Sequence, residues 1–130
     1  MIDLSPCSEP LPSAALEAIR QFNAGEYYEQ HDALEALWRA EPRPVRRLYQ
    51  GILQIGVAYY QITCGNRRGA LKMLARGLRW LDQLPDVCQG VDVARLRADA
   101  RAVQSALAAS PDLSGFDPAL LQPVRLLGAP

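Results

Sequence analysis

Hydrophobic residues recur every three or four positions through most of the chain, which is the period of a helix with one buried face. This period breaks at glycine and proline, the residues that most often end helices. Together these signals predict five helices, over residues 14–24, 26–40, 44–64, 67–84 and 93–109. Because no stretch shows the strict alternation of a strand, we expect an all-α, single-domain helical bundle.

Local signals support the predicted helix ends. Ser13, Asn66 and Asp92 are placed to cap the first, fourth and fifth helices with their side-chain oxygens. Gly25 can end the first helix in the left-handed conformation that favours glycine. The prolines at positions 42 and 44 separate the second helix from the third. This short connection predicts that these two helices form a central antiparallel helical hairpin.

Proline-rich segments flank the bundle, which we expect to span residues 13–109. Residues 1–12 predict an irregular N-terminal arm. Residues 110–130 predict a mostly irregular tail with at most one helical turn at 117–121. Some of the tail's side chains are apolar and have to be covered: Leu120, Leu121, Val124, Leu126 and Leu127. They can pack on the bundle or on a second subunit, so a homo-oligomer is one expectation.

Four glycines lie inside predicted helices, at positions 51, 56, 69 and 77, where each costs up to about 1 kcal/mol relative to alanine. We expect close helix crossing to compensate, with Gly51 and Ala58 on the third helix facing Ala70 and Gly77 on the fourth. The alternative is room for a ligand.

A polar cluster lies on the inward face of the second predicted helix. His31, Leu34, Glu35 and Trp38 are spaced by three and four residues, so their side chains leave the helix on one side. A carboxylate beside an imidazole can orient it and act with it as a general acid or base. The candidate catalytic residues are therefore His31, Asp32 and Glu35.

A metal ion is a second interpretation of this cluster. His31 is the only histidine, so a histidine-rich zinc site is excluded within one chain. A magnesium or manganese ion held mainly by carboxylates is the remaining metal hypothesis. We expect no cofactor and assign no metal ligand, with a divalent metal as the alternative.

A third interpretation is a ligand pocket lined by aromatic and amide side chains: Tyr28, Trp38, Gln54, Tyr59 and Tyr60. In an antiparallel hairpin, His31, Glu35 and Gln54 would meet halfway along the two helices. The purely structural alternative is a hydrogen-bonded network that fixes helix register, in which His31 bonds to Glu35 or to a tyrosine hydroxyl.

Charge is segregated along the chain although the formal net charge is zero. Residues 42–81 contain no acidic residue and several basic ones: Arg43, Arg46, Arg47, Arg67, Arg68, Lys72, Arg76 and Arg79. Arg67 and Arg68 fall in the first turn of the fourth predicted helix, where they oppose the helix dipole and would suit an anion. The alternative is a solvated face that pairs with the acids of the first two helices. Because overall positive charge is lacking and aromatic residues are few here, we do not expect nucleic-acid binding.

The cysteines and the N-terminus indicate a compartment. Cys7, Cys64 and Cys88 are odd in number and lack the spacing of zinc or thioredoxin-like motifs, so we expect three reduced thiols. Residues 1–6 have neither the basic region nor the apolar run of a secretory signal, and no other stretch could span a membrane. These features predict a cytoplasmic protein without membrane contact.

Part of the chain resembles a known family. The first residues that carry the resemblance are Phe22, Gly25, Glu26, Tyr28, Glu29, His31, Asp32, Glu35 and Trp38. They are followed by Tyr49-Gln50-Gly51-Ile52-Leu53-Gln54 and by Gly65-Asn66 with Gly69-Ala70. Over about residues 22–84 these motifs resemble the domain-of-unknown-function family 309, small all-helical proteins of bacteria and archaea.

The resemblance implies a helical bundle and carries over no activity, because the family has no established one. The family usually shows Glu-Ala-His-Glu where this chain has residues 29–32, Glu-Gln-His-Asp, and often has a histidine near positions 59–61. The second acid is therefore shorter here, and the missing histidine argues against a metal site. We therefore expect a binding or structural domain with a polar cluster at His31 and Glu35, taking a small molecule or an anion. The alternatives are a small metal-assisted or acid/base enzyme using His31, Asp32 and Glu35, and an interaction protein using the basic face of residues 67–84.

Overall fold

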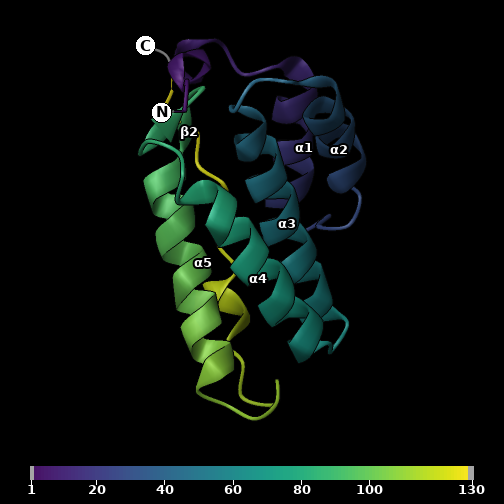
Figure 1. Ribbon diagram of the computed structural model, residues 1–130. Coiled ribbons are helices and arrows are strands. Elements are labelled where there is room, and N and C mark those ends of the chain that lie inside the picture. Colours follow the sequence, from purple (N-terminus) through teal and green to yellow (C-terminus); the bar gives the residue numbers. More distant parts are fainter. Residues whose placement is uncertain (1, 129–130) are drawn as a thin grey trace.

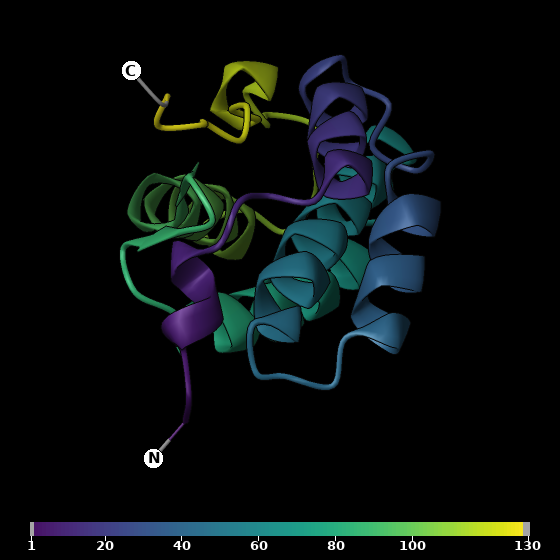
Figure 2. The same cartoon turned by 90° about the horizontal axis from the view of Figure 1, so that it is seen from above.

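The computed structural model describes residues 2–128 and confirms a single, mainly helical domain. Within these residues the α-helices are α1 (Ser13–Asn23), α2 (His31–Ala40), α3 (Arg46–Thr63), α4 (Arg67–Leu81) and α5 (Val93–Ala108). α3 lies between α4 on one side and α1 and α2 on the other, and α5 lies beyond α4 (Figure 1). The view from above places α2 and α5 on opposite sides of α3 (Figure 2). No helix in the described part of the chain is long and apolar enough to cross a bilayer.

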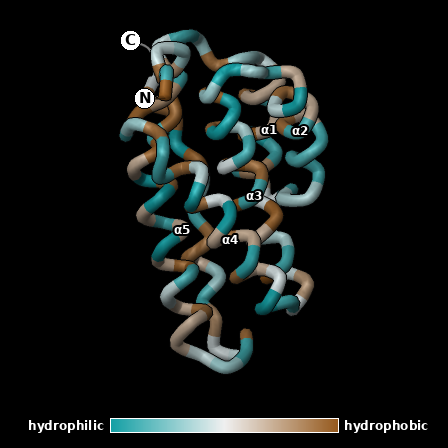
Figure 3. Tube along the Cα trace, viewed as in Figure 1, coloured by the Kyte–Doolittle hydropathy of each residue, from teal (hydrophilic) through white to brown (hydrophobic). Residues whose placement is uncertain are grey.

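α2 and α3 run antiparallel, as the sequence predicts. Tyr28, just before α2, and Tyr60, near the end of α3, have ring centroids 5.0 Å apart. At the opposite end of the pair, Trp38 of α2 lines a hollow together with Gln50 of α3. Hydrophobic positions recur along each helix between hydrophilic ones (Figure 3).

The closest helix crossing lies between α3 and α4, which confirms the role expected of two glycines. A Cβ atom at Gly51 would lie 2.5 Å from Leu81 Cδ2, and one at Gly77 would lie 2.7 Å from Ile55 Cδ1. Ala70 on α4 is fully buried as expected. Neither glycine position can hold a larger side chain without moving its neighbour.

The other two helical glycines have different roles. A Cβ atom at Gly56 would collide with the amide of Gln30, and one at Gly69 would collide with the side chain of Asn66. Gly56 makes room for a buried side chain, and Gly69 makes room for a cap.

Asn66 and Asp92 cap α4 and α5 as predicted, because their side chains accept hydrogen bonds from the backbone N–H groups of Gly69 and Arg95. Gly25 follows α1 with a φ of 82°, which confirms its left-handed conformation. The expectation for Ser13 is wrong: Pro12 holds the capping position and no side chain caps α1.

α2 begins at His31 and not at Glu26, so the predicted start of this helix is wrong. Gln30 explains the delay. Its side chain is fully buried, and its Nε2 donates to the carbonyl of Leu53 at 3.1 Å. Residues 27–30 form turns that bring Gln30 under α3, beside Gly56. A tertiary hydrogen bond has therefore overridden the local helical pattern.

A small antiparallel hairpin corrects the expectation of no strands. Its strands are β1 (Val87–Cys88) and β2 (Val91–Asp92), too short for their alternation to show in the sequence. Gln89 and Gly90 between them both have positive φ, as a tight two-residue turn requires. Val91 also bridges Leu126, so the tail extends this sheet.

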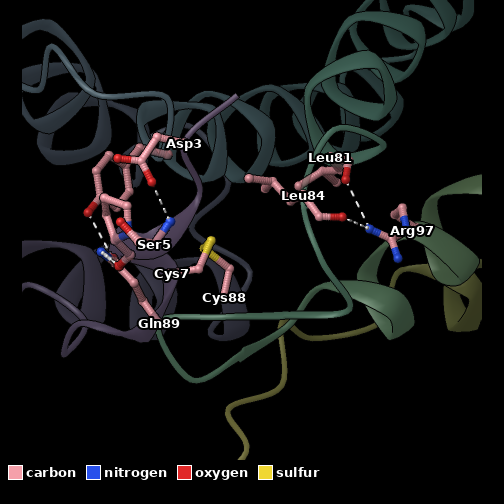
Figure 4. Close-up of a disulfide and its surroundings, with 10 residues drawn as sticks. Asp3, Ser5, Cys7, Leu81, Leu84, Cys88, Gln89 and Arg97 are labelled. Atoms are coloured by element: carbon pink, nitrogen blue, oxygen red, sulfur yellow. Dashed lines mark hydrogen bonds between the residues drawn. A yellow bond between two sulfur atoms is a disulfide. The ribbon is translucent and has the colours of Figure 1, made fainter. Parts of the chain in front are cut away.

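The expectation of three reduced thiols is also wrong, because Cys7 and Cys88 form a disulfide and only Cys64 is free among the described residues. The bond joins the 3-10 turn η1 (Ser5–Ser8) to β1 (Figure 4). Gln89 adds to this connection, since its Nε2 donates to the Pro6 carbonyl at 3.1 Å. The disulfide and this hydrogen bond therefore attach the N-terminal arm to the hairpin, although the sequence of the arm carries no helical pattern.

The tail packs partly on the bundle. Val124 is buried and exchanges two hydrogen bonds with the Asn23 side chain, at 2.8 and 2.9 Å. Leu120 in the turn η2 (Pro118–Leu120) and Leu121 pack against the core as half-buried residues. Leu126 and Leu127 stay 41% and 48% exposed. The bundle therefore covers most but not all of the tail's apolar side chains.

The α3–α4 crossing makes Gly51 a sensitive position. A Gly51→Ala substitution gains about 1 kcal/mol of helix propensity but overpacks the contact with Leu81. We expect the free energy of unfolding to fall by about 1 to 2 kcal/mol in urea denaturation. Gly115→Ala is the matched control, because its Cβ would meet nothing within 4 Å. Equal stability of both variants and wild type would show that the crossing is not tight.

The disulfide predicts a second stability effect. Replacing both Cys7 and Cys88 with serine should lower the free energy of unfolding by about 4 kcal/mol, because the bond joins residues 81 apart and restricts the unfolded chain. Denaturation with and without a dithiol reductant measures it. The reductant should destabilise wild type and Cys64→Ser but leave the double variant unchanged. A wild type insensitive to reductant would contradict a stabilising disulfide.

Candidate functional site

A hollow of about 280 Å³ lies at the meeting point of α2, α3 and α4. Its lining, which we call the tryptophan groove, consists of Trp38 of α2, Gln50 and Gln54 of α3, and Arg76, Arg79 and Trp80 of α4. Spacing by four residues puts the two glutamines on one side of α3, and Arg76 and Trp80 on one side of α4. The volume is at the lower end of the range for ligand pockets, about 300 to 1,000 Å³, so the groove suits a small molecule.

Gln50 is the most informative residue of the groove. It is only 8% exposed, yet its side-chain amide forms no hydrogen bond with any residue from 2 to 128. The amide atoms of Gln50 are not among the side-chain atoms sealed from solvent. Because Gln50 lines the groove, its amide is available to a molecule placed there.

Two further groups of the groove are unsatisfied. Trp38 Nε1 and Gln54 Oε1 are both inaccessible to solvent and have no hydrogen-bond partner within the described residues. The groove thus contains one hydrogen-bond donor and one acceptor that the described residues do not satisfy. Other unsatisfied buried atoms lie elsewhere in the described chain, so these two are informative because both belong to residues that line one hollow.

The α4 side of the groove is positively charged. Arg76 and Arg79 are exposed, and neither has a carboxylate within 4.0 Å in the described part of the chain. The guanidinium of Arg47 lies 6.0 Å from the Trp80 ring centroid, and its Nη1 has no hydrogen-bond partner. Three arginine side chains therefore surround one indole without a counter-ion.

The ion pairs expected between this basic face and the first two helices do not form. Glu17 of α1 pairs with Arg20 at 3.3 Å, and Glu35 of α2 pairs with Arg39 at 2.7 Å. The acids of α1 and α2 are used within their own helices, which leaves the basic side chains of α4 without a carboxylate partner within residues 2–128.

The predicted catalytic residues lie together at the surface, near the start of α2. His31 Nδ1 is 2.7 Å from the carbonyl oxygen of Tyr28 and therefore carries the hydrogen of that bond. His31 Nε2 faces two carboxylates, at 3.2 Å from Asp32 Oδ1 and 3.9 Å from Glu35 Oε2. Gln54 is not part of this group, so the expected meeting of His31, Glu35 and Gln54 halfway along the hairpin is wrong. Gln54 lines the tryptophan groove instead.

Metal chemistry finds little support at this cluster. No group of three or more His, Cys, Asp or Glu side chains within residues 2–128 is arranged to hold a metal ion. The Asp32 side chain is 86% exposed, and Glu35 turns towards Arg39.

The tyrosines predicted to line a pocket lie elsewhere. Tyr59 is fully buried in the core, with its ring 5.6 Å from those of Phe22 and Tyr27, so its predicted place in the pocket is wrong. Tyr28 and Tyr60 pack on each other near His31, away from the groove, and Tyr28 is 51% exposed. The helical period alone could not separate a core tyrosine from a pocket tyrosine.

Arg67 has a structural role that the sequence did not show. Its Nε and Nη2 both donate to the Leu107 carbonyl, at 3.0 and 2.9 Å, so it ties the start of α4 to the end of α5. Arg68 is exposed. Of the two predicted anion-binding residues, Arg68 alone keeps a guanidinium that bonds to no carbonyl or carboxylate in the described chain.

The groove and the bundle define the class: a small helical domain with a ligand-sized, basic and aromatic groove. Residues 15–73 match the model of the family described as "Domain of unknown function (DUF309)", which confirms the resemblance over that span. The matched span contains Trp38, Gln50 and Gln54, and it ends before Arg76, Arg79 and Trp80. The basic side of the groove is therefore a feature of this chain outside the matched region.

Two curated relatives are similar to parts of the chain. "Uncharacterized protein YpuF" of Bacillus subtilis is 33% identical over 72 residues, which are 54% of this chain and 41% of the relative. An uncharacterized protein of Aquifex aeolicus is 24% identical over 83 residues, which are 63% of this chain and 25% of the relative. The chain thus spans well under half the length of these relatives.

The groove as a whole was missed at the sequence level, although a signal existed. Positions 50 and 54, and positions 76 and 80, repeat the i, i+4 spacing of residues that share one helix face. Glutamine, arginine and tryptophan at such positions indicate a polar face on each helix. Only the α3–α4 contact in the structure shows that these two polar faces lie next to each other.

The buried hydroxyl of Tyr59 leads to a testable prediction about stability. Its hydroxyl has no hydrogen bond, and burial, followed by the nearby Asp99 carboxylate, raises the pKa of Tyr59. Tyr59→Phe removes this group, so we expect the free energy of unfolding at pH 7 to rise by about 1 kcal/mol in urea denaturation. Tyr28→Phe at an exposed ring is the control at this pH.

The same substitution should change stability at alkaline pH. Above about pH 10 an unfolded tyrosine ionises. Folded Tyr59 keeps its proton there, so the folded state binds more protons and wild type loses stability as the pH rises. The Tyr59→Phe variant should lose less between pH 9 and 11. Identical slopes for the two proteins would contradict a raised pKa of Tyr59.

Proposed function

We propose that this domain is a binding module that holds a small anionic ligand in the tryptophan groove. The observation that carries the proposal is the tryptophan groove itself, where Trp38 Nε1 and Gln54 Oε1 are sealed from solvent without a partner in residues 2–128, and where Gln50, a residue only 8% exposed, lines the same hollow. Arg76 and Arg79 supply the positive charge, and guanidinium groups bind carboxylate and phosphate in two-point geometry. Trp38 and Trp80 supply apolar ring surface for the rest of the ligand.

Acid–base chemistry at His31 is a second candidate, favoured by one observation. The Tyr28 carbonyl fixes the ring through Nδ1, which leaves Nε2 directed at Asp32 and Glu35. This arrangement would orient a general acid or base. The groove is preferred, because it combines volume, positive charge and unused hydrogen-bonding groups.

Location and assembly remain predictions. A cytoplasmic location was predicted from the N-terminus and the cysteines, and the Cys7–Cys88 disulfide is more typical of oxidising compartments. A homodimer would have an apolar surface available, since Val87, Leu126 and Leu127 are each more than 40% exposed. The proposed binding function requires neither a cofactor nor a second subunit.

Intrinsic fluorescence tests the proposal, because both tryptophans of the chain line the groove. Phenyl phosphate combines an anion with a flat ring, and its titration should change the emission in a saturable way. Arg76→Ala and Arg79→Ala should each weaken binding at least about tenfold, since a hydrogen bond to a charged group is worth about 1.5 to 3 kcal/mol. Isothermal titration calorimetry gives the affinities.

Two control variants locate the site. Arg68→Ala removes the same charge from the same helix outside the groove, and His31→Ala alters the other candidate cluster. Both should bind phenyl phosphate like wild type. Equal weakening by Arg68→Ala and Arg76→Ala would show only a diffuse positive field. Loss of binding in His31→Ala alone would move the site to His31.

A further inference from the structure

The groove combines three kinds of group that together match one ligand class. It holds two indole rings, an unpartnered amide on its α3 side and arginines on its α4 side. An indole stacks on a flat ring, an amide reads the edge of a ring that has a donor beside an acceptor, and arginine binds phosphate. A nucleotide carries a flat base with such an edge and a phosphate.

We infer that the tryptophan groove binds an adenine nucleotide with a single phosphate, and this inference rests on the proposed function. A glutamine amide forms two parallel hydrogen bonds with adenine, accepting from N6 and donating to N7. Gln50 offers such an amide, and its polar atoms are not sealed from solvent as Gln54 Oε1 is.

The size and the charge of the groove limit the ligand to one nucleotide. A hollow of about 280 Å³ is too small for a longer strand, and the six lining residues come from three adjacent helices. Arg76 and Arg79, with no carboxylate partner within residues 2–128, can bind a phosphate without breaking an internal ion pair. Arg47 already lies over the Trp80 ring, so a base stacked nearby would join an existing cation and ring pair.

An adenine base with one phosphate could belong to a free mononucleotide or to the terminal nucleotide of an RNA. Titration with adenosine monophosphate and with a 5′-phosphorylated oligoadenylate separates the two sources. Tighter binding of the mononucleotide indicates a free metabolite. Tighter binding of the oligonucleotide indicates an RNA end. Either result supports recognition of an adenine nucleotide.

The decisive comparison is between adenosine monophosphate, inosine monophosphate and ribose 5-phosphate, measured by tryptophan fluorescence and calorimetry. Inosine monophosphate replaces the N6 donor with an acceptor, so it should bind at least tenfold more weakly. Ribose 5-phosphate lacks the base and should bind at least a hundredfold more weakly.

Gln50→Leu is the matched variant, because it keeps the approximate size of the side chain and removes the amide. It should weaken adenosine monophosphate at least tenfold and erase the preference over inosine monophosphate, and it should weaken phenyl phosphate less, because phenyl phosphate offers no donor and acceptor edge to the amide. A cooperative urea transition with the wild-type slope shows that the variant is folded.

The outcomes separate this inference from the proposed function. If ribose 5-phosphate or inosine monophosphate binds as well as adenosine monophosphate while phenyl phosphate also binds, the groove is an anion site and adenine recognition is overturned. If phenyl phosphate, both mononucleotides and ribose 5-phosphate all fail to bind, the proposed function fails as well.

Discussion

Close contact between α3 and α4 is the constraint on which the rest of the structure depends. Gly51 and Gly77 leave no space for a Cβ atom, so the two backbones meet at van der Waals distance. This contact places the glutamines of α3 next to Arg76 and Trp80 of α4, which creates the groove. α5 is in turn tied to the end of α4, because Arg97 donates to the carbonyls of Leu81, the last residue of α4, and of Leu84.

A single buried polar side chain sets the position of α2. Gln30 enters the core, bonds to the Leu53 carbonyl and occupies the space that Gly56 leaves. The chain before it must turn, which delays α2 by five residues relative to the sequence pattern and moves the tyrosine–histidine contact to the surface. One hydrogen bond and one glycine thus separate the His31 cluster from the groove.

The sequence predicted those features that depend on local pattern. The bundle, the α3–α4 glycine contact and the caps at Asn66 and Asp92 follow from periodicity and from residue chemistry at helix ends. The disulfide and the hairpin could not be predicted, because they join segments far apart in sequence or only two residues long. Of the groove, Trp38 and Gln54 were identified, whereas its assembly with α4 depends on tertiary contact.

The start of α3, which carries Gln50 of the groove, is connected to the hairpin and the N-terminal arm. Tyr49, the residue before Gln50, donates its hydroxyl hydrogen to Gln89 Oε1 at 2.8 Å, and Gln89 follows the disulfide-linked Cys88. The start of α3 is therefore connected to the hairpin and the N-terminal arm. Figure 4 shows the disulfide that links the arm to the hairpin, with Gln89 beside it. Through this hydrogen bond and the disulfide, the turn of α3 that carries Gln50 is joined to segments far away in the sequence. Such cross-links restrict the movement of the backbone from which Gln50 projects, and a binding site on a rigid backbone loses less conformational entropy when a ligand binds.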